Sequence, residues 1–170
     1  GFPIVETYAP WSVHELGAAG RFDFGEDDPR KDLGALLDLA AEKGLRAIFR
    51  PGPHINAELT YFGFPERLLR DESLLARTAR GAKVLLPVPP RMFPIPSYAS
   101  EKFFEETARW YDAVAEVVAP RLAPRGPVVL VQVDNEAALF FRDGLFEQDY
   151  HPDAILAFRA FLRTRYPTSE

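Results

Sequence analysis

The sequence predicts an α/β fold whose strands are parallel. Strand-like apolar runs alternate along the chain with segments of helical periodicity, in the order β-α-β-α-β-α. The links from helix to strand are short, whereas the links from strand to helix are long and hold most of the unusual polar and aromatic residues. Because such links follow the carboxyl ends of parallel strands, we expect the functional residues to gather there.

Three segments are predicted to be strands: residues 1–8, 45–50 and 128–133. The first is rich in β-branched and aromatic residues, which favour strands. The second is predicted to end at the Pro-Gly-Pro sequence of residues 51–53, because proline and glycine interrupt regular structure. The third is almost wholly apolar, which is typical of a buried parallel strand.

Helices are predicted at residues 29–43, 100–119 and 152–165. The first has Asp28 as its N-cap, Pro29 at its first position and Gly44 at its end. Helical spacing gives the second one apolar face, formed by Phe104, Ala108, Tyr111, Ala115 and Val118. A shorter helical stretch is expected near residues 66–78. The proline-rich residues 87–96 are expected to form a rigid packed loop, since a linker would be more polar.

The composition excludes several classes of protein. The 170 residues include 25 acidic and 20 basic side chains, and this net charge of −5 lacks the positive footprint of a nucleic-acid-binding protein. Cysteine is absent, which excludes disulfides, thiolate metal sites and a cysteine nucleophile. No signal peptide is visible and no run of about 20 apolar residues occurs, so we expect a soluble chain whose compartment stays open.

Polar side chains follow each of the three predicted strands. They are Glu6, Tyr8, Trp11, His14 and Glu15, then Arg50, His54, Asn56 and Glu58, then Gln132, Asp134, Asn135 and Glu136. Carboxylates and amides bind hydroxyl groups, and aromatic rings stack on the apolar face of a sugar, so this combination favours a carbohydrate site. The sequence has no phosphate-binding glycine loop and no nucleophile elbow.

Several of these residues also have a structural interpretation. Histidines such as His14 and His54 are more often hydrogen-bonded core residues than catalytic bases. The default interpretation of Arg50 is that it neutralises the acidic strand ends. A metal site of His14, Glu15, His54 and Glu58 is not favoured, because the spacing matches no known ligand motif. We expect no metal and no organic cofactor.

Glu136 differs from the other carboxylates. It follows a wholly apolar strand, where burial would raise the pKa of its carboxyl group. A carboxyl group that stays protonated near neutral pH is what a general acid requires.

Three motifs carry a family resemblance. They are residues 6–15 (ETYAPWSVHE) followed by 20–24 (GRFDF), residues 50–58 (RPGPHINAE) followed by 63–65 (GFP), and residues 131–136 (VQVDNE). Together, in this order and at this spacing, they resemble strand ends of the family 35 glycoside hydrolases, the retaining β-galactosidases. The sequence departs from the family pattern at Ser12, where Asn is usual, and at His54, where Tyr is usual.

The resemblance implies a (β/α)8 TIM barrel. Residues 1–170 would be a fragment of one catalytic barrel domain, truncated at both ends, with about three consecutive βα units that correspond to strands two to four. The resemblance makes Glu136 the general acid/base and places Asn135 beside the sugar hydroxyl next to the anomeric carbon. It assigns the lining of the terminal galactose subsite to Tyr8, Asn56, Ala57 (through its backbone) and Glu58.

The reaction implied by the resemblance removes terminal β-linked galactose by double displacement. The family nucleophile is a glutamate at the end of the seventh strand, so it would lie outside this chain, the remainder of the barrel would be its partner, and the isolated chain would be inactive. Glu58 as nucleophile is a weaker alternative. Two other functions stay open: a non-catalytic carbohydrate-binding protein of barrel ancestry, and a related glycosidase for another β-linked sugar, such as a glucosaminidase or arabinosidase.

Overall fold

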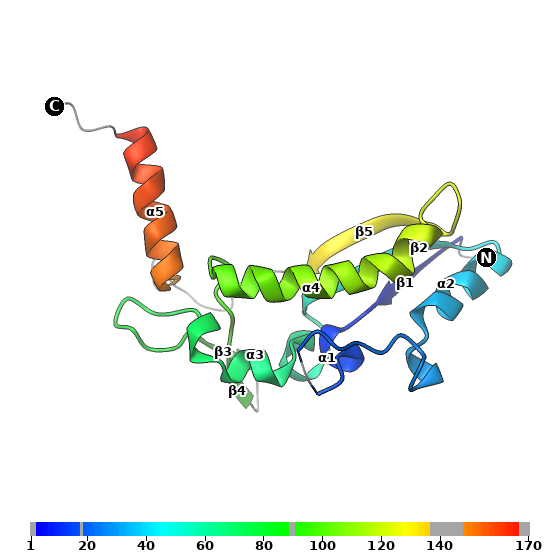
Figure 1. The fold of residues 1–170 in the computed structure, drawn as a ribbon, viewed down its shortest axis with the longest axis horizontal. Helices are drawn as coiled ribbons and strands as arrows, with labels where there is room; N and C mark the ends of the chain where they lie inside the picture. Colours follow the sequence, from blue (N-terminus) through cyan, green and yellow to red (C-terminus); the bar gives the residue numbers. More distant parts are fainter. Residues whose placement is uncertain (1–2, 18, 89–90, 137–147, 167–170) are drawn as a thin grey trace. The chain divides into compact units, whose positions relative to one another are not determined.

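The computed structural model describes residues 3–17, 19–88, 91–136 and 148–166 (Figure 1). The chain divides into two compact units. One comprises residues 1–65 with 106–137, and the other comprises residues 66–105 with 138–170.

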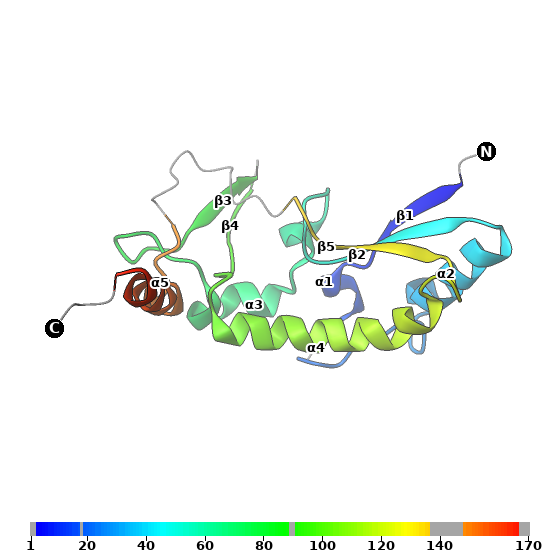
Figure 2. The same ribbon diagram turned by 90° about the horizontal axis from the view of Figure 1, so that it is seen from above.

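The first unit contains a parallel sheet, as predicted. Its strands are β1 (Ile4–Tyr8), β2 (Arg46–Ile55) and β5 (Val128–Asn135), in that order across the sheet. The register pairs Tyr8 with Arg50 and Ile55 with Asn135, so the carboxyl ends of neighbouring strands lie side by side. The connecting helices α2 (Leu33–Glu42) and α4 (Glu101–Val118) lie on the same side of this sheet (Figure 2). Two crossovers of the same hand, taken in the same direction, require this arrangement.

The helix predicted at residues 29–43 consists of two pieces. A 3-10 turn, η1 (Pro29–Lys31), begins at Asp28, whose carboxylate accepts a hydrogen bond from the Arg30 amide. Helix α2 then begins after Asp32, whose carboxylate accepts from the Ala35 amide at 2.7 Å. Each carboxylate satisfies an amide that has no partner within its own helix.

Strand β2 is longer than predicted. The expectation that it ends at residue 50 is wrong, because the strand continues through Pro51, Gly52 and Pro53 to Ile55. Its register against β5 shifts on both sides of Gly52, and Gly52 itself has a φ of +81°. Such bulges let a strand carry prolines, which cannot donate to the ladder, and the positive φ suits glycine. The bulged extension brings the residues after Gly52 level with the end of β5.

Strand β5 is more exposed than predicted. Val128 is buried, but Val131 and Val133 are 42% and 67% exposed, so the prediction of a fully buried strand is wrong. Among the strands of the described residues, β5 pairs with β2 alone. Together with residues of α4, Val131 and Val133 line an apolar groove that is open to solvent.

Helix α4 lies within one residue of its predicted bounds at each end, but its buried face differs from the predicted one. Phe104 is 58% exposed, whereas the buried positions are Phe103, Glu106, Thr107, Trp110, Val114 and Val118. Trp110 decides this orientation. Its indole Nε1 donates to the Pro51 carbonyl oxygen at 2.8 Å, and the hydroxyl of Tyr111 donates to the Gly52 carbonyl oxygen at 2.5 Å. The helix therefore holds the bulge of β2 in place.

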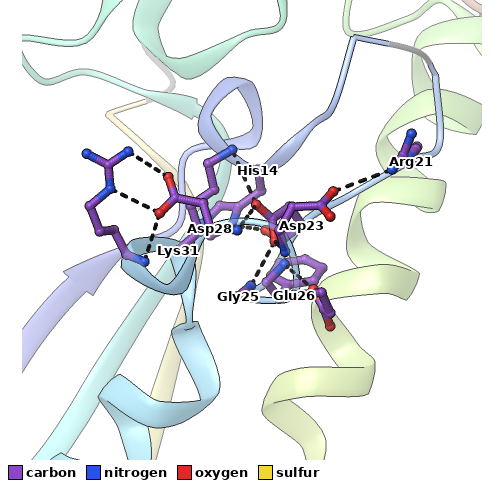
Figure 3. Close-up of polar contacts among 10 residues, drawn as sticks. His14, Arg21, Asp23, Gly25, Glu26, Asp28 and Lys31 are labelled. Carbon is purple, nitrogen blue, oxygen red and sulfur yellow. Dashed lines mark hydrogen bonds and ion pairs between the residues drawn. The ribbon is translucent and has the colours of Figure 1, made fainter.

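The loop between β1 and α2 is organised around the buried Asp23 (Figure 3). Its carboxylate accepts hydrogen bonds from the backbone amides of Gly25, Asp27 and Asp28 at 3.0–3.1 Å, and it lies 3.6 Å from the Lys31 ammonium. Burial by itself would raise the pKa of Asp23, but the amide hydrogen bonds and Lys31 outweigh it and lower the pKa.

The same loop fills the core beneath the sheet. Trp11 of the short helix α1 (Trp11–His14) stacks parallel to Trp110, with ring centroids 6.1 Å apart. His14 is buried, stacks on Phe24 and lies with its Nδ1 2.9 Å from the Asp23 carbonyl oxygen. Burial lowers the pKa of His14. His14 is therefore a packed core residue here.

The second unit contains a hairpin where a packed loop was predicted. Strands β3 (Leu85–Val88) and β4 (Arg91–Pro94) are antiparallel. The prolines are tolerated because both strands of a two-stranded hairpin are edge strands. The helical stretch expected at residues 66–78 is confined to α3 (Glu66–Arg70) and the 3-10 turn η3 (Glu72–Leu74), whereas α5 (Pro152–Arg165) matches its predicted bounds. No helix among the described residues is both long and apolar enough to cross a membrane.

We predict that Trp110→Phe lowers the free energy of unfolding by about 1–3 kcal/mol, because the buried Pro51 carbonyl oxygen loses its donor. Urea denaturation measures the change. Phe104→Leu on the exposed face of the same helix is the control and should stay within about 0.5 kcal/mol. Equal losses in the two variants would contradict the assigned orientation of α4.

The stabilisation that Asp23 provides should depend on pH. Because the pKa of Asp23 is lowered in the folded chain, its contribution is complete above the unfolded pKa of about 3.9 and is lost as the pH falls through the lower folded value. The stability difference between the parent and Asp23→Asn, measured by urea denaturation from neutral to acid pH, should therefore shrink below pH of about 4. A difference that does not change with pH would contradict this role.

Candidate functional site

The ends of the three parallel strands are joined by one guanidinium group. Arg50 on β2 donates from one terminal nitrogen to the Tyr8 hydroxyl and to Asn135 Oδ1, both at 3.1 Å. Its other terminal nitrogen pairs with the Glu6 carboxylate at 2.8 Å. The sequence predicts that Arg50 neutralises the acidic strand ends. In the structure Arg50 contacts β1 on one side and β5 on the other.

Asn135 is the buried centre of the cluster. Its Oδ1 accepts from Arg50 and also from Gln132 Nε2 at 3.1 Å, and its Nδ2 donates to the Asn56 carbonyl oxygen at 3.4 Å. These partners fix the amide group with its oxygen toward Arg50 and its nitrogen toward the loop after β2.

Glu136 lies next to the loop that follows β2. Asn56 donates from Nδ2 to Glu136 Oε2 at 2.9 Å, so the structure brings these two predicted site residues into contact. The carboxylate itself is exposed, and the prediction that Glu136 is buried is wrong. The reason is that Glu136 follows the last residue of β5, where the chain leaves the sheet with a φ of +52°.

Asp134 clamps the ends of β2 and β5 together. Its Oδ1 accepts hydrogen bonds from the backbone amides of His54 at 2.8 Å and of Asn135 at 3.2 Å. Asp134 has a φ of +62°, which turns its side chain toward β2. Sequence reasoning placed Asp134 in the polar cluster but missed this role. The available signal was that aspartate is among the few residues that tolerate left-handed backbone.

His54 is buried at the same junction. Its Nδ1 lies 3.1 Å from the Asn135 carbonyl oxygen, and its ring meets Phe62 edge-on with centroids 4.9 Å apart. Burial lowers the pKa of His54, although the carboxylate of Asp134 opposes the shift. The neutral ring is therefore the favoured form.

The other predicted sugar-lining residues differ in their exposure and in whether they bond to this cluster. Tyr8 is 39% exposed beside Arg50. Ala57 uses its backbone within the loop, where its amide donates to the Ile55 carbonyl oxygen at 2.9 Å and its carbonyl accepts from the Leu59 amide at 2.6 Å. Glu58 is exposed on that loop and takes no part in the hydrogen bonds between Asn56, Asn135 and Glu136. Within the described residues, no three His, Asp or Glu side chains are grouped so that they could hold a metal ion.

The first half of the chain matches a known family. The sequence model described as glycosyl hydrolases family 35 matches residues 1–82, which include β1, the Asp23 loop and all of β2. This match includes the first two of the three motifs. The resemblance inferred from the motifs is confirmed.

Three curated relatives have about the same sequence identity to this chain but carry different names. A beta-1,2-glucosyltransferase of Ignavibacterium album is 33% identical over 174 residues, which cover 100% of this chain and 23% of the relative. The beta-galactosidase-1-like protein 3 of Homo sapiens is 34% identical over 152 residues, 89% of this chain and 20% of its own length. An exo-beta-D-glucosaminidase of Thermococcus kodakarensis is 35% identical over 140 residues, 80% of this chain and 17% of its own. The chain thus spans about a fifth of the length of these relatives.

The clamp made by Asp134 can be tested by stability. Asp134→Ala leaves two backbone amides without their acceptor and should lower the free energy of unfolding by about 1–3 kcal/mol. Asp134→Asn keeps a side-chain oxygen and tolerates the positive φ, so it should lose less than about 1 kcal/mol. Urea denaturation of both variants provides the measurement, and an Asn variant as unstable as the Ala variant would contradict the clamp.

Proposed function

We propose that this chain is part of the catalytic barrel of a retaining glycoside hydrolase that removes terminal β-linked galactose. The observation that carries the proposal is the contact between Asn56 and Glu136 at the joined ends of β2 and β5. This contact holds an exposed carboxylate in a fixed position at the edge of a parallel sheet, where α/β barrels bind their substrates.

Glu136 serves as the general acid/base in this proposal. In the first step its carboxyl group protonates the leaving glycosidic oxygen, while a second carboxylate forms a bond to the anomeric carbon. In the second step Glu136 removes a proton from water, which attacks the same carbon and releases the sugar. Its exposure allows direct contact with substrate, and the hydrogen bond from Asn56 restricts the positions that the carboxylate can take.

The sugar is held by the residues around Glu136. We assign the contact to the hydroxyl beside the anomeric carbon to Asn135, whose amide is fixed by Arg50 and Gln132. Tyr8, Asn56, Ala57 and Glu58 then line the terminal subsite. Tyr8 and Glu58 are exposed enough for such contacts.

The nucleophile belongs to another part of the barrel in this proposal. The chain spans about a fifth of the length of its relatives, and the family pattern assigns the nucleophilic glutamate to the seventh strand. We assign β1, β2 and β5 to barrel strands two, three and four of a single catalytic domain, with the remaining strands as their partners. By this assignment, the 170 residues hold one of the two catalytic carboxyl groups, and alone they should show no turnover.

The first experiment tests which sugar the protein removes. The full-length protein is given aryl β-galactoside, β-glucosaminide and β-glucoside, and initial rates are compared at equal concentration. We expect the galactoside to react fastest. If the glucosaminide or the glucoside reacts faster, that sugar takes the place of galactose in the proposal. If the sugar is transferred to an added saccharide instead of to water, the proposed reaction becomes glycosyl transfer in place of hydrolysis.

The role of Glu136 is tested by Glu136→Gln in the full-length protein. We expect the rate on a substrate with a poor leaving group, such as a disaccharide, to fall by about 10²–10⁴-fold, because the acid is lost. The rate on an aryl galactoside with an activated leaving group should fall much less in its first step, since that oxygen needs no proton.

A small anion distinguishes the acid/base from a nucleophile. In Glu136→Ala, azide can attack the glycosyl-enzyme without a general base, so it should restore turnover of the activated substrate and yield a β-glycosyl azide. Unchanged disaccharide hydrolysis in Glu136→Gln would refute the assignment. Sugar binding with no turnover by the parent protein would favour a carbohydrate-binding protein.

A further inference from the structure

We propose that His54 is a positioning residue that fixes the peptide carrying Glu136. His54 lies in β2 just after the bulge at Gly52, and its side chain is only 4% exposed. The inference rests on the proposed function for its kinetic test, but the geometry behind it is independent of the substrate.

The hydrogen bond defines the tautomer of the ring. The Asn135 carbonyl oxygen can only accept, so the Nδ1 of His54, 3.1 Å away, carries the proton and donates it. In a neutral ring Nε2 is then unprotonated. It is buried and has no hydrogen-bond partner among the described residues, beside the rings of Phe62 and Phe64. Burial lowers the pKa of His54 and so favours this neutral form.

The bonded carbonyl belongs to the peptide that joins Asn135 to Glu136. Fixing this oxygen fixes the plane of the peptide, and with it the direction in which Glu136 leaves the sheet at its φ of +52°. The Asn56 amide approaches the same oxygen at 3.4 Å, a longer contact than that of His54. Because the His54 amide is itself held by Asp134, the ring has a fixed base from which to donate.

A role in packing alone makes a different prediction. If the ring only fills space between Phe62 and the end of β5, phenylalanine should replace it well. If the donor at the δ position matters, asparagine should replace it better than phenylalanine, because its Nδ2 occupies about the place of Nδ1. Glutamine carries its donor at the place of Nε2, so it serves as the matched control.

The experiment compares His54→Asn, His54→Gln and His54→Phe in the full-length protein. Thermal melting first identifies the variants that fold. We expect kcat/KM on a disaccharide to fall about tenfold in the Gln and Phe variants, which corresponds to one hydrogen bond of about 1.4 kcal/mol, and less than threefold in the Asn variant. The loss should be smaller on an activated aryl galactoside, because His54 acts through the acid Glu136. Equal losses in Asn and Gln, or equal losses on both substrates, would overturn the proposal.

Crystal structures of the same variants separate this proposal from the proposed function. In His54→Asn the side-chain amide should lie within hydrogen-bond distance of the Asn135 carbonyl oxygen, and Glu136 should keep its contact with Asn56. In the Gln and Phe variants that peptide should turn and the contact should be lost. An unmoved Glu136 in all three structures would overturn the positioning role, whatever the substrate. If no glycoside is turned over but Glu136 moves as expected, the proposed function fails and the positioning role stands.

Discussion

The arrangement of the strand ends depends on the contacts of the Arg50 guanidinium group. One cation on the middle strand reaches Glu6 and Tyr8 on β1 and Asn135 on β5. A partly buried ion pair is stabilising only when its other hydrogen-bonding groups are satisfied, and the three contacts of Arg50 meet most of this requirement. Its Nε is buried without a hydrogen-bond partner in the described structure, which adds a desolvation cost to the arrangement. Both flanking strands must therefore end in register with Arg50.

A second constraint is the bulge of β2. Without it, the prolines of residues 51–53 would end the strand, and Asn56 would not lie beside the end of β5. The bulge is held from one side by Trp110 and Tyr111 of α4, which bond to the carbonyl oxygens of Pro51 and Gly52. It is held from the other side by Asp134, which bonds to the His54 amide. The core helix and the candidate site are thus coupled through four residues of backbone.

The exposure of Glu136 changes how its chemistry is understood. A buried carboxyl would have been tuned by desolvation, but this carboxylate is exposed and is positioned by hydrogen bonding. The buried polar groups beneath it, Asn135 and His54, then serve to hold its backbone.

The sequence by itself determined the parallel α/β order, the bounds of α4 and α5 and the polar strand ends, because periodicity, capping residues and motifs are local properties. Its motifs also indicated the family whose sequence model matches residues 1–82. Only the tertiary structure decided which face of α4 is buried, since Phe104 and Trp110 are both large aromatic residues and the Pro51 carbonyl oxygen accepts a hydrogen bond from Trp110. It likewise decided that β2 passes through its prolines and that Asp134 and Glu136 take left-handed backbone. These features depend on partners about 60 to 80 residues away, such as Pro51 for Trp110 and His54 for Asp134, which no local pattern contains.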